Sequence, residues 1–310
     1  MKIDTHQHYW HYQADDFPWI SEAMPSLQRN CCPTDCKAAL EAAGVQAPNA
    51  VQARAVAAET EFLLRTAAHN PEVLGVIGWA DLGGNDLAQQ LDGWCAEPAF
   101  KGLRHILQDE PDVGCWAAAA SHNRGLRLLQ KHRRVYEILV FHHQMPSVIE
   151  FCARHDAHWL VLDHAGKPPL DNRKNDRQAL SRWDTAIHQL ACMPHVVCKL
   201  SGLVTETEWQ SGAGLSAENT QSILACFDTV LGAFGPDRLM FGSDWPVCEL
   251  AAPYAQVHAL AHTWARSRLT ALEQAAFWGE TAMRCYGLKP PSKEAELAAR
   301  PQALNPADPF

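Results

Sequence analysis

Two histidines near the start of the chain have the spacing of a metal-binding or catalytic pair. His6 and His8 stand two residues apart in the segment IDTHQH, residues 3–8, which predicts a strand. Residues two apart on a strand face the same side, so the imidazoles would share one space about 6–7 Å apart. Such a pair can chelate one divalent ion. Two core histidines hydrogen-bonded to neighbours are the alternative that this spacing alone leaves open.

The last apolar run of the chain leads into a carboxylate. The run LMFGS, residues 239–243, directly precedes Asp244. A carboxylate at the end of a buried strand is costly unless it meets a metal ion, a cation or a catalytic task. We therefore predict that Asp244 belongs to the same centre as His6 and His8. Capping of the segment that follows is the alternative role.

Other predicted strands also end in basic side chains. The fourth carries Arg104 and His105, the fifth leads into His143, and the sixth ends at His164. Imidazoles at several strand ends, together with Asp244, predict one active centre. The catalytic candidates are Asp244, His164 and His105.

Eight short apolar runs alternate with helical patterns, which predicts an α/β fold. The predicted strands are residues 2–10, 50–57, 74–80, 102–107, 136–142, 159–164, 196–200 and 239–243. Several are rich in Val, Ile and Leu without polar alternation, as in parallel strands buried on both faces. Eight such units favour a closed (β/α)8 TIM barrel over an open doubly wound sheet, because no glycine-rich phosphate loop follows the first strand. A closed barrel places its last strand beside its first and its active site at the C-terminal strand ends.

Length and composition fit one large domain. The chain has 310 residues, of which 47% are hydrophobic and 20% charged, and its formal net charge is -9. We predict a single barrel over residues 1–288 and a Pro- and Ala-rich tail over 289–310. An acidic chain without a basic run is not expected to bind nucleic acid or an anionic membrane. A small-molecule substrate is the expected partner, and a homo-oligomer is compatible with the sequence.

The cysteines and the N-terminal segment predict the cellular compartment of the protein. Most of the 11 cysteines stand in apolar runs, where a thiol behaves as a small hydrophobe. No stretch of 18 apolar residues predicts a membrane span, and the first strand begins too early to leave room for a signal peptide. We therefore expect a cytoplasmic protein with free thiols.

Several segments, taken together, resemble the amidohydrolase superfamily. They are DTHQHYW (4–10), LDHAGKP (162–168), the strand that leads into Asp244, and FWGETAMRCY (277–286). FPWI (17–20), GLRHILQD (102–109) and KLSGL (199–203) resemble its lactonase branch, which includes L-fuconolactonases, L-rhamnonolactonases and 2-pyrone-4,6-dicarboxylate lactonase. The resemblance covers residues 2–288 and implies a hydrolase that opens a lactone ring.

One departure from the family limits the expected metal content. Binuclear members carry a carbamylated lysine at the end of strand four, where this chain has Arg104 and His105. The resemblance therefore implies one weakly held, zinc-like divalent ion on His6, His8 and Asp244, or none, and no organic cofactor. Lys199 on the seventh strand is better placed to donate to a substrate oxygen than to bridge metals. A lysine that merely reaches the barrel rim is its alternative role.

Lactone hydrolysis needs an activated water, a group that stabilises charge on the carbonyl oxygen, and a proton for the leaving alkoxide. We predict Asp244 as the general base. A metal ion would assist it, or else His6, His8, His164 or Arg104 would carry the developing charge.

Residues around the expected mouth are candidates for substrate binding. They are Trp10, Trp19, Arg104, His143, Lys167, Lys199 and Trp245. Aromatic faces suit the apolar side of a sugar ring, although packing against the barrel is the alternative for each tryptophan. A dicarboxylate would require two or more arginines, so a neutral aldonolactone such as L-fucono- or L-rhamnonolactone is favoured over a pyrone dicarboxylate. An aromatic-acid decarboxylase on the same fold and a barrel that only binds a ligand are the alternatives, and the lack of a dinucleotide fingerprint disfavours an oxidoreductase.

Overall fold

Eight parallel strands pair in sequence order around a barrel. The computed structural model describes residues 1–171, 176–211 and 214–289, so nearly all of the predicted tail lies outside the described residues. The strands are β1 (Ile3–Gln7), β2 (Ala47–Val51), β3 (Gly75–Gly78), β4 (Phe100–His105), β5 (Val135–Ile138), β6 (Leu160–Leu162), β7 (Val196–Leu200) and β8 (Leu239–Phe241). The predicted (β/α)8 barrel is confirmed.

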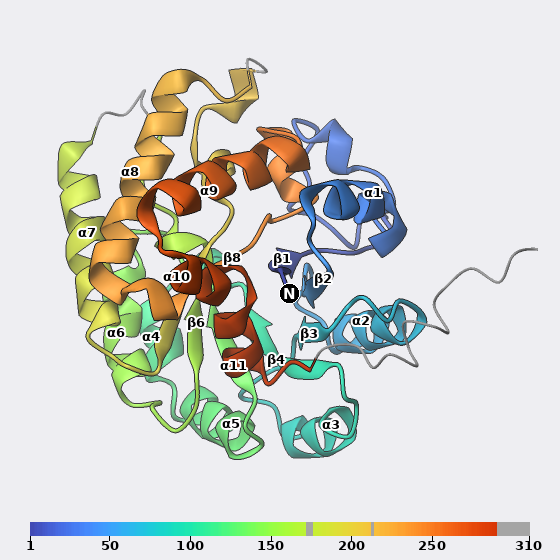
Figure 1. Ribbon diagram of the computed structural model, residues 1–310. Helices are drawn as coiled ribbons and strands as arrows, with labels where there is room; N and C mark the ends of the chain where they lie inside the picture. Colours follow the sequence, from blue (N-terminus) through green and yellow to red (C-terminus); the bar gives the residue numbers. More distant parts are fainter. Residues whose placement is uncertain (172–175, 212–213, 290–310) are drawn as a thin grey trace, which may run out of the picture.

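Helices surround the strands, with α1–α3 on one side of the view and α6–α8 on the other (Figure 1). They are α1 (Pro33–Ala43), α2 (Ala57–His69), α3 (Leu87–Trp94), α4 (Val113–Ala118), α5 (Ala120–Lys131), α6 (Met145–Ala153), α7 (Arg177–Ala191), α8 (Ala217–Phe234), α9 (Tyr254–Arg268), α10 (Ala271–Ala275) and α11 (Thr281–Tyr286). Short 3-10 turns are η1 (Pro25–Leu27), η2 (Leu107–Asp109), η3 (Asp163–Gly166), η4 (Leu203–Glu206), η5 (Trp209–Ser211), η6 (Pro236–Arg238) and η7 (Val247–Leu250), and the π-helical segment is η8 (Ala276–Glu280).

The barrel closes where the chain after β8 runs beside β1. The amide of Asp244 donates to the His6 carbonyl at 2.9 Å, and the amide of His8 donates to the Trp245 carbonyl at 2.8 Å. Gly242 permits this approach, because an added Cβ would lie 2.8 Å from the His6 Cβ and 2.9 Å from that of Ser201. The closure fixes the end of β8 beside the His6–His8 pair.

The barrel interior is built in layers. Its floor is an apolar cluster that includes Val135, Val161, Val197 and Met240 and is covered by Tyr286 and other residues of α11. Side chains two residues further along a strand point the same way, so the next inward layer holds Glu137, Asp163 and Lys199. All three charged side chains are completely buried. The catalytic face therefore lies above an apolar floor and a charged layer.

The eight strands lie where they were predicted, but several of their boundaries are wrong. β2 begins at Ala47, not at residue 50, and Ala57 begins α2 instead of ending the strand. Pro48 fits inside β2 because its carbonyl accepts a hydrogen bond from the Leu74 amide at 3.1 Å. Ala119, whose ψ is 124°, separates α4 from α5.

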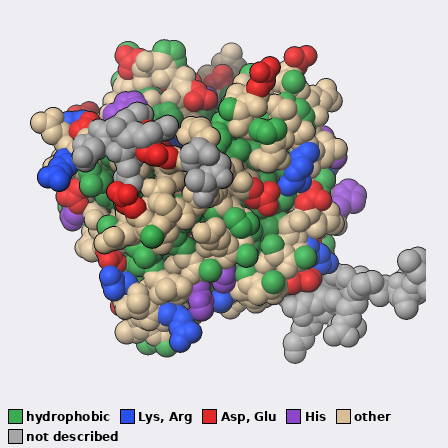
Figure 2. Space-filling view, turned by 90° about the horizontal axis from the view of Figure 1, so that it is seen from above, with side chains coloured by type: hydrophobic (Ala, Val, Ile, Leu, Met, Phe, Trp, Pro, Cys, Tyr) green, Lys and Arg blue, Asp and Glu red, His purple; other side chains and the backbone are tan. Residues whose placement is uncertain are grey.

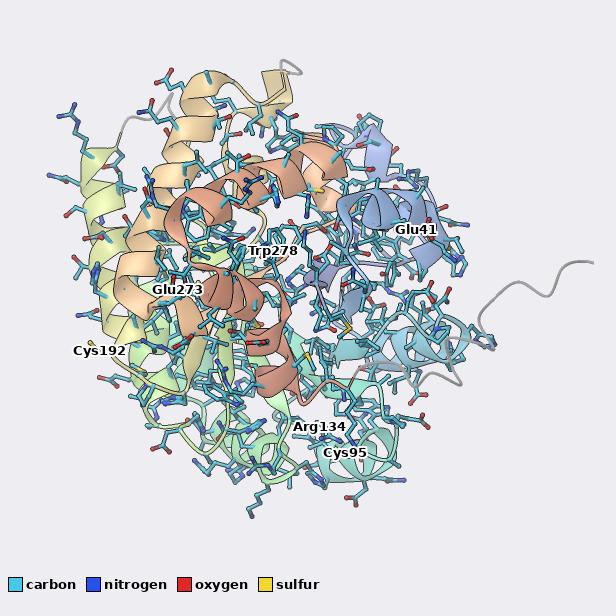
Figure 3. All side chains as sticks on the ribbon, viewed as in Figure 1. Glu41, Cys95, Arg134, Cys192, Glu273 and Trp278 are labelled. Carbon is cyan, nitrogen blue, oxygen red and sulfur yellow. The ribbon has the colours of Figure 1, made fainter. Side chains whose placement is uncertain are left out.

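The surface and the cysteines agree with the composition. On the face in Figure 2, acidic and basic side chains are interspersed among neutral and apolar ones. All eleven cysteines are free, and Cys95 and Cys192 lie at the periphery, directly after α3 and α7 (Figure 3). Among the described residues, no helix has the length and hydropathy needed to cross a bilayer.

Candidate functional site

A cavity of about 370 Å³ opens at the C-terminal strand ends. His8, Arg104, His164, Lys167 and Asp244 line it, so it joins residues from strands one, four, six and eight. A wider surface hollow between α7 and α8 is lined by none of these residues. The chemistry predicted from the sequence therefore belongs to the smaller cavity.

The His6–His8 pair and Asp244 meet at the base of this cavity. Asp244 Oδ1 lies 3.2 Å from His8 Nε2 and 3.6 Å from His6 Nε2. Potential ligand atoms of the three residues all lie within 4.8 Å of one another, and all three side chains are buried. Closure of the barrel thus places the carboxylate of the last strand beside both imidazoles of the first.

The hydrogen bonds of His8 fit a cation at this position. His8 Nδ1 lies 2.8 Å from the Val51 carbonyl, which can only accept, so Nδ1 carries a proton. The other nitrogen, Nε2, then faces the Asp244 carboxylate with its lone pair. Only a proton or a metal ion between these two acceptors satisfies both. The donor set therefore suits one ion on His6, His8 and Asp244.

His164 completes the ring of imidazoles around Asp244. Its Nε2 lies 3.9 Å from Asp244 Oδ1, its Nδ1 lies 2.9 Å from Ser201 Oγ, and its ring centroid is 4.5 Å from that of His6. Burial lowers the pKa of His164 to about 4, so the ring is neutral near pH 7. Burial alone would raise the pKa of Asp244, but the neighbouring imidazoles of His164, His8 and His6 lower it instead. Asp244 is therefore an ionised carboxylate.

Backbone strain is concentrated at this site. His164, Ala165, Gly166 and Lys167 have consecutive positive φ angles of 52°, 49°, 66° and 50°, and Asp244 has a φ of 64°. Non-glycine residues rarely adopt this left-handed region, which costs about 1–2 kcal/mol per residue. The strained turn after β6 presents both His164 and Lys167 to the cavity.

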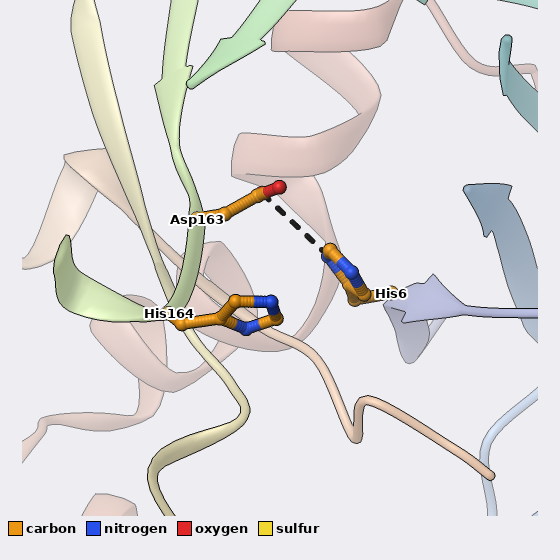
Figure 4. A group of neighbouring side chains, drawn as sticks. All are labelled: His6, Asp163 and His164. Carbon is orange, nitrogen blue, oxygen red and sulfur yellow. Dashed lines mark ion pairs between the residues drawn. The ribbon is translucent and has the colours of Figure 1, made fainter. Parts of the chain in front are cut away.

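Beneath the cavity, Lys199 joins the charged layer to His6. Its Nζ lies 2.6 Å from Glu137 Oε2, 3.2 Å from Asp163 Oδ1 and 3.1 Å from His6 Nδ1. Figure 4 shows Asp163 and His164, neighbours at the end of β6, both pointing toward His6, with Asp163 Oδ1 3.6 Å from His6 Nδ1. Lys199 does not line the cavity, so its position does not support the predicted contact with substrate.

Arg104 links this layer to the cavity. Its Nη1 lies 3.0 Å from Asp163 Oδ2 and 3.1 Å from His6 Nε2, and its Nη2 donates to the carbonyl of Gln52. Burial raises the pKa of Glu137 to about 7. Burial would also raise the pKa of Asp163, but Lys199, His6 and Arg104 hold it well below its usual range. Asp163 is thus the firmly ionised partner of both cations.

Two predicted histidines point elsewhere. His105 accepts from Trp79 Nε1 at 2.9 Å, contacts Glu110 Oε1 at 2.7 Å and stacks on Trp116 outside the barrel. Neighbours on a strand alternate, so Arg104 takes the inward position and His105 the outward one. His143 stacks on Phe141 and lines an adjoining hollow, not the cavity. Neither position supports the role predicted for the residue.

Of the three predicted tryptophans, only Trp19 lines the cavity. Trp10 and Trp245 are 1% and 2% exposed. Their indole nitrogens donate to the Arg29 carbonyl at 2.8 Å and to Glu249 Oε1 at 3.0 Å. Trp10 and Trp245 therefore pack the loops against the barrel, which was the alternative role.

Sequence reasoning missed several polar and aromatic residues of the site. Asp163 and Glu137 each interrupt an apolar strand run, and that signal could have revealed them. Glu206 and Trp209 also line the cavity, but they stand in turns after β7 without a recognisable pattern.

Comparison with known proteins finds close relatives over nearly the whole chain. A sequence profile described as Amidohydrolase matches residues 3–288. L-fucono-1,5-lactonase of Burkholderia multivorans is 50% identical over 292 residues, 94% of this chain and 98% of that protein. A protein of the same name from Burkholderia ambifaria is 31% identical over 259 residues, 84% of this chain and 85% of that one. A crystal structure of a Burkholderia multivorans amidohydrolase with bound zinc has a TM-score of 0.90 and 50% identity, covering 93% of this chain and 100% of that chain.

The buried contacts of Lys199 predict a large loss of stability in Lys199→Met. Two buried carboxylates would lose their shared cation, and breaking such a pair costs about 3–5 kcal/mol. Urea unfolding should show this loss, whereas Lys131→Met, at an exposed position of α5, should unfold at the wild-type urea concentration. Adding Glu137→Gln to Lys199→Met should restore part of the stability. A Lys199→Met protein as stable as wild type would contradict the proposed charge balance.

Proposed function

The chain belongs to the amidohydrolase family, and we propose that it hydrolyses a sugar lactone, with L-fucono-1,5-lactone as the leading substrate. The membership confirms the family resemblance of the sequence. The observation that carries the proposal is the ionised Asp244 surrounded by His6, His8 and His164 at the base of a cavity.

Asp244 acts as the general base in this proposal. The surrounding imidazoles lower its pKa, so the carboxylate is ionised throughout the neutral range and can take the proton as water attacks the carbonyl. Water adds to the lactone carbonyl carbon as its proton passes to Asp244. The ring C–O bond then breaks, and the proton returns from Asp244 to the alkoxide, which gives an open hydroxy acid.

Two cavity residues support the charged intermediate. Arg104 lines the cavity with a guanidinium that cannot lose its charge, so it can stabilise negative charge on the carbonyl oxygen. His164 is neutral and lies within reach of Asp244, so it can orient the water or relay the proton.

A divalent ion fits the same centre. His6, His8 and Asp244 would hold it, because their potential ligand atoms all lie within 4.8 Å of one another. When bound, a zinc-like ion lowers the pKa of water and polarises a carbonyl. Lys199 Nζ and Arg104 Nη1 already contact the two nitrogens of His6, so we infer that the ion is held weakly.

The lining of the cavity supports a neutral sugar lactone over a dicarboxylate. Arg104 is the one arginine among the described lining residues, whereas Trp19 and Trp209 offer aromatic surface for the apolar face of a sugar ring. Substrate-binding roles for Trp19, Arg104 and Lys167 therefore stay in the proposal. The eleven free thiols support a cytoplasmic location for the enzyme.

Removal of the Asp244 carboxylate tests the mechanism. We expect Asp244→Asn to lower kcat about 10²- to 10⁴-fold on L-fucono-1,5-lactone, followed with a pH indicator after subtraction of spontaneous ring opening. Asp92→Asn, at a side chain that is 78% exposed on α3, should retain wild-type activity. Unchanged kcat in Asp244→Asn would reject the role of this base. A wild-type enzyme that opens no sugar lactone of five- or six-membered ring would reject the proposed function itself.

Zinc titration of the metal-free protein tests the ion site without measuring turnover. We expect one zinc ion per chain by calorimetry, with affinity reduced at least about tenfold in His8→Ala because a ligand is lost. His69→Ala, on the exposed surface of α2, serves as the matched control. Equal zinc affinity in His8→Ala and wild type would exclude this ligand set.

A further inference from the structure

A mostly buried ion pair stands in the cavity wall and has no part in the ring-opening steps derived above. Lys167 Nζ lies 3.5 Å from Glu206 Oε1, and the two side chains are only 16% and 17% exposed. Both residues line the cavity that Asp244 and His164 also line. Charged side chains are rarely buried this far without a structural or binding task.

The chain fixes both members of this pair on short, well-bonded turns. The amide of Lys167 donates to the His164 carbonyl at 2.8 Å, and Nδ1 of His142 lies 3.1 Å from the Lys167 carbonyl. Glu206 ends the turn η4, where the Thr205 hydroxyl donates to the Gly202 carbonyl at 2.8 Å. Side chains carried on such rigid segments can meet a ligand without losing much further freedom.

Lys167 stands in the strained turn after β6, which suggests a functional role for its position. Lys167 has a φ of 50° at the end of the left-handed run that begins at His164. A backbone conformation of this cost persists where the surrounding structure enforces it, and such residues cluster at functional sites. The same left-handed turn that carries His164 beside Asp244 therefore carries Lys167 beside Glu206 in the cavity wall.

The contact leaves the pair with capacity for a ligand. A charge-assisted hydrogen bond between an ammonium and a carboxylate is about 2.7–2.9 Å long, and this contact is longer. An ammonium has three donors and a carboxylate about four acceptor positions, so one contact does not exhaust either group. Burial raises the pKa of Glu206, while Lys167 opposes that rise. An uncharged ligand with several hydroxyl groups can satisfy both charges without separating them.

Aromatic rings complete the surroundings. Lys167 Nζ lies 4.9 Å from the centroid of Phe141, and Phe141 and Trp209 both line the same cavity. A wall that combines aromatic faces with a paired acid and base suits a ligand whose ring has an apolar C–H side and a hydroxyl-bearing edge. An unsubstituted ring would leave the two charged groups without new partners.

We propose that Glu206 and Lys167 form a hydroxyl-binding subsite that selects lactones carrying ring hydroxyls over lactones without them. The inference rests on the proposed lactone hydrolysis, and it extends that function by assigning the origin of substrate selectivity. Glu206 accepts hydrogen bonds from hydroxyls on ring carbons that point away from Asp244. Lys167 donates to the oxygen of one of these hydroxyls and keeps the Glu206 carboxylate ionised and in place.

A selectivity ratio tests this subsite. We compare kcat/KM for L-fucono-1,5-lactone with that for δ-valerolactone, which has the same six-membered ring without hydroxyls. Loss of hydrogen bonds to a charged partner corresponds to about a 10- to 100-fold effect, so Glu206→Gln should reduce the ratio by this amount. The loss should appear mainly in KM for the sugar lactone. Lys167→Met should reduce the ratio in the same direction.

Two control variants separate a loss of selectivity from a general loss of activity. Glu206→Asp retains the charge on a shorter side chain and should reduce the ratio less than Glu206→Gln does. Glu150→Gln, at a side chain that is 90% exposed on α6, should give the wild-type ratio. If Glu206→Gln lowers kcat/KM equally for both lactones, or for neither, the subsite is rejected while lactone hydrolysis stands. A wild-type enzyme that opens neither lactone rejects the proposed function and the subsite together.

Discussion

The Lys199 ammonium between Glu137 and Asp163 is the interaction on which the site depends. Placing ions inside a barrel costs several kcal/mol each unless opposite charges lie close and hydrogen bonds are made. Lys199 meets this condition for two carboxylates at 2.6 and 3.2 Å, and Arg104 adds a second cation on Asp163 at 3.0 Å. The same two cations reach opposite nitrogens of His6, and burial together with Lys199 holds the pKa of His6 well below its usual range. The position and charge state of His6 thus follow from the layer beneath it.

This charge balance has a chemical consequence for the cavity above. Cations already occupy both sides of His6, so a divalent ion there meets repulsion as well as ligands. Such a site favours weak metal binding, and the positive charge of Arg104 then shares the electrostatic work at the cavity. The strained backbone around the cavity also depends on this framework. His164, Lys167 and Asp244 can keep left-handed conformations because the surrounding barrel holds the chain in place.

The sequence predicted the parts of the site that topology determines. In a closed barrel the end of the last strand must lie beside the first, so Asp244 could be placed next to His6 and His8 without coordinates. The end of a strand is harder to define than its existence, and an uncertainty of one residue reverses which side chain faces inward. That is why His105 was expected in the centre that Arg104 occupies. Trp10 and Trp245 show a related limit, because loop aromatics serve packing as readily as binding.

The catalytic residues lie at strand ends, whereas Glu206 of the selectivity subsite lies in a turn after β7. His6, His8, His164 and Asp244 occupy strand ends, where the barrel repeats one geometry and the side chains converge. Glu206 and Trp209 stand in turns after β7, whose conformation depends on local hydrogen bonds such as that from Thr205 to Gly202. Turns can change without disturbing the charged layer that supports the catalytic histidines. A barrel of this kind can thus keep one hydrolytic centre while the turns above it decide which ring is opened.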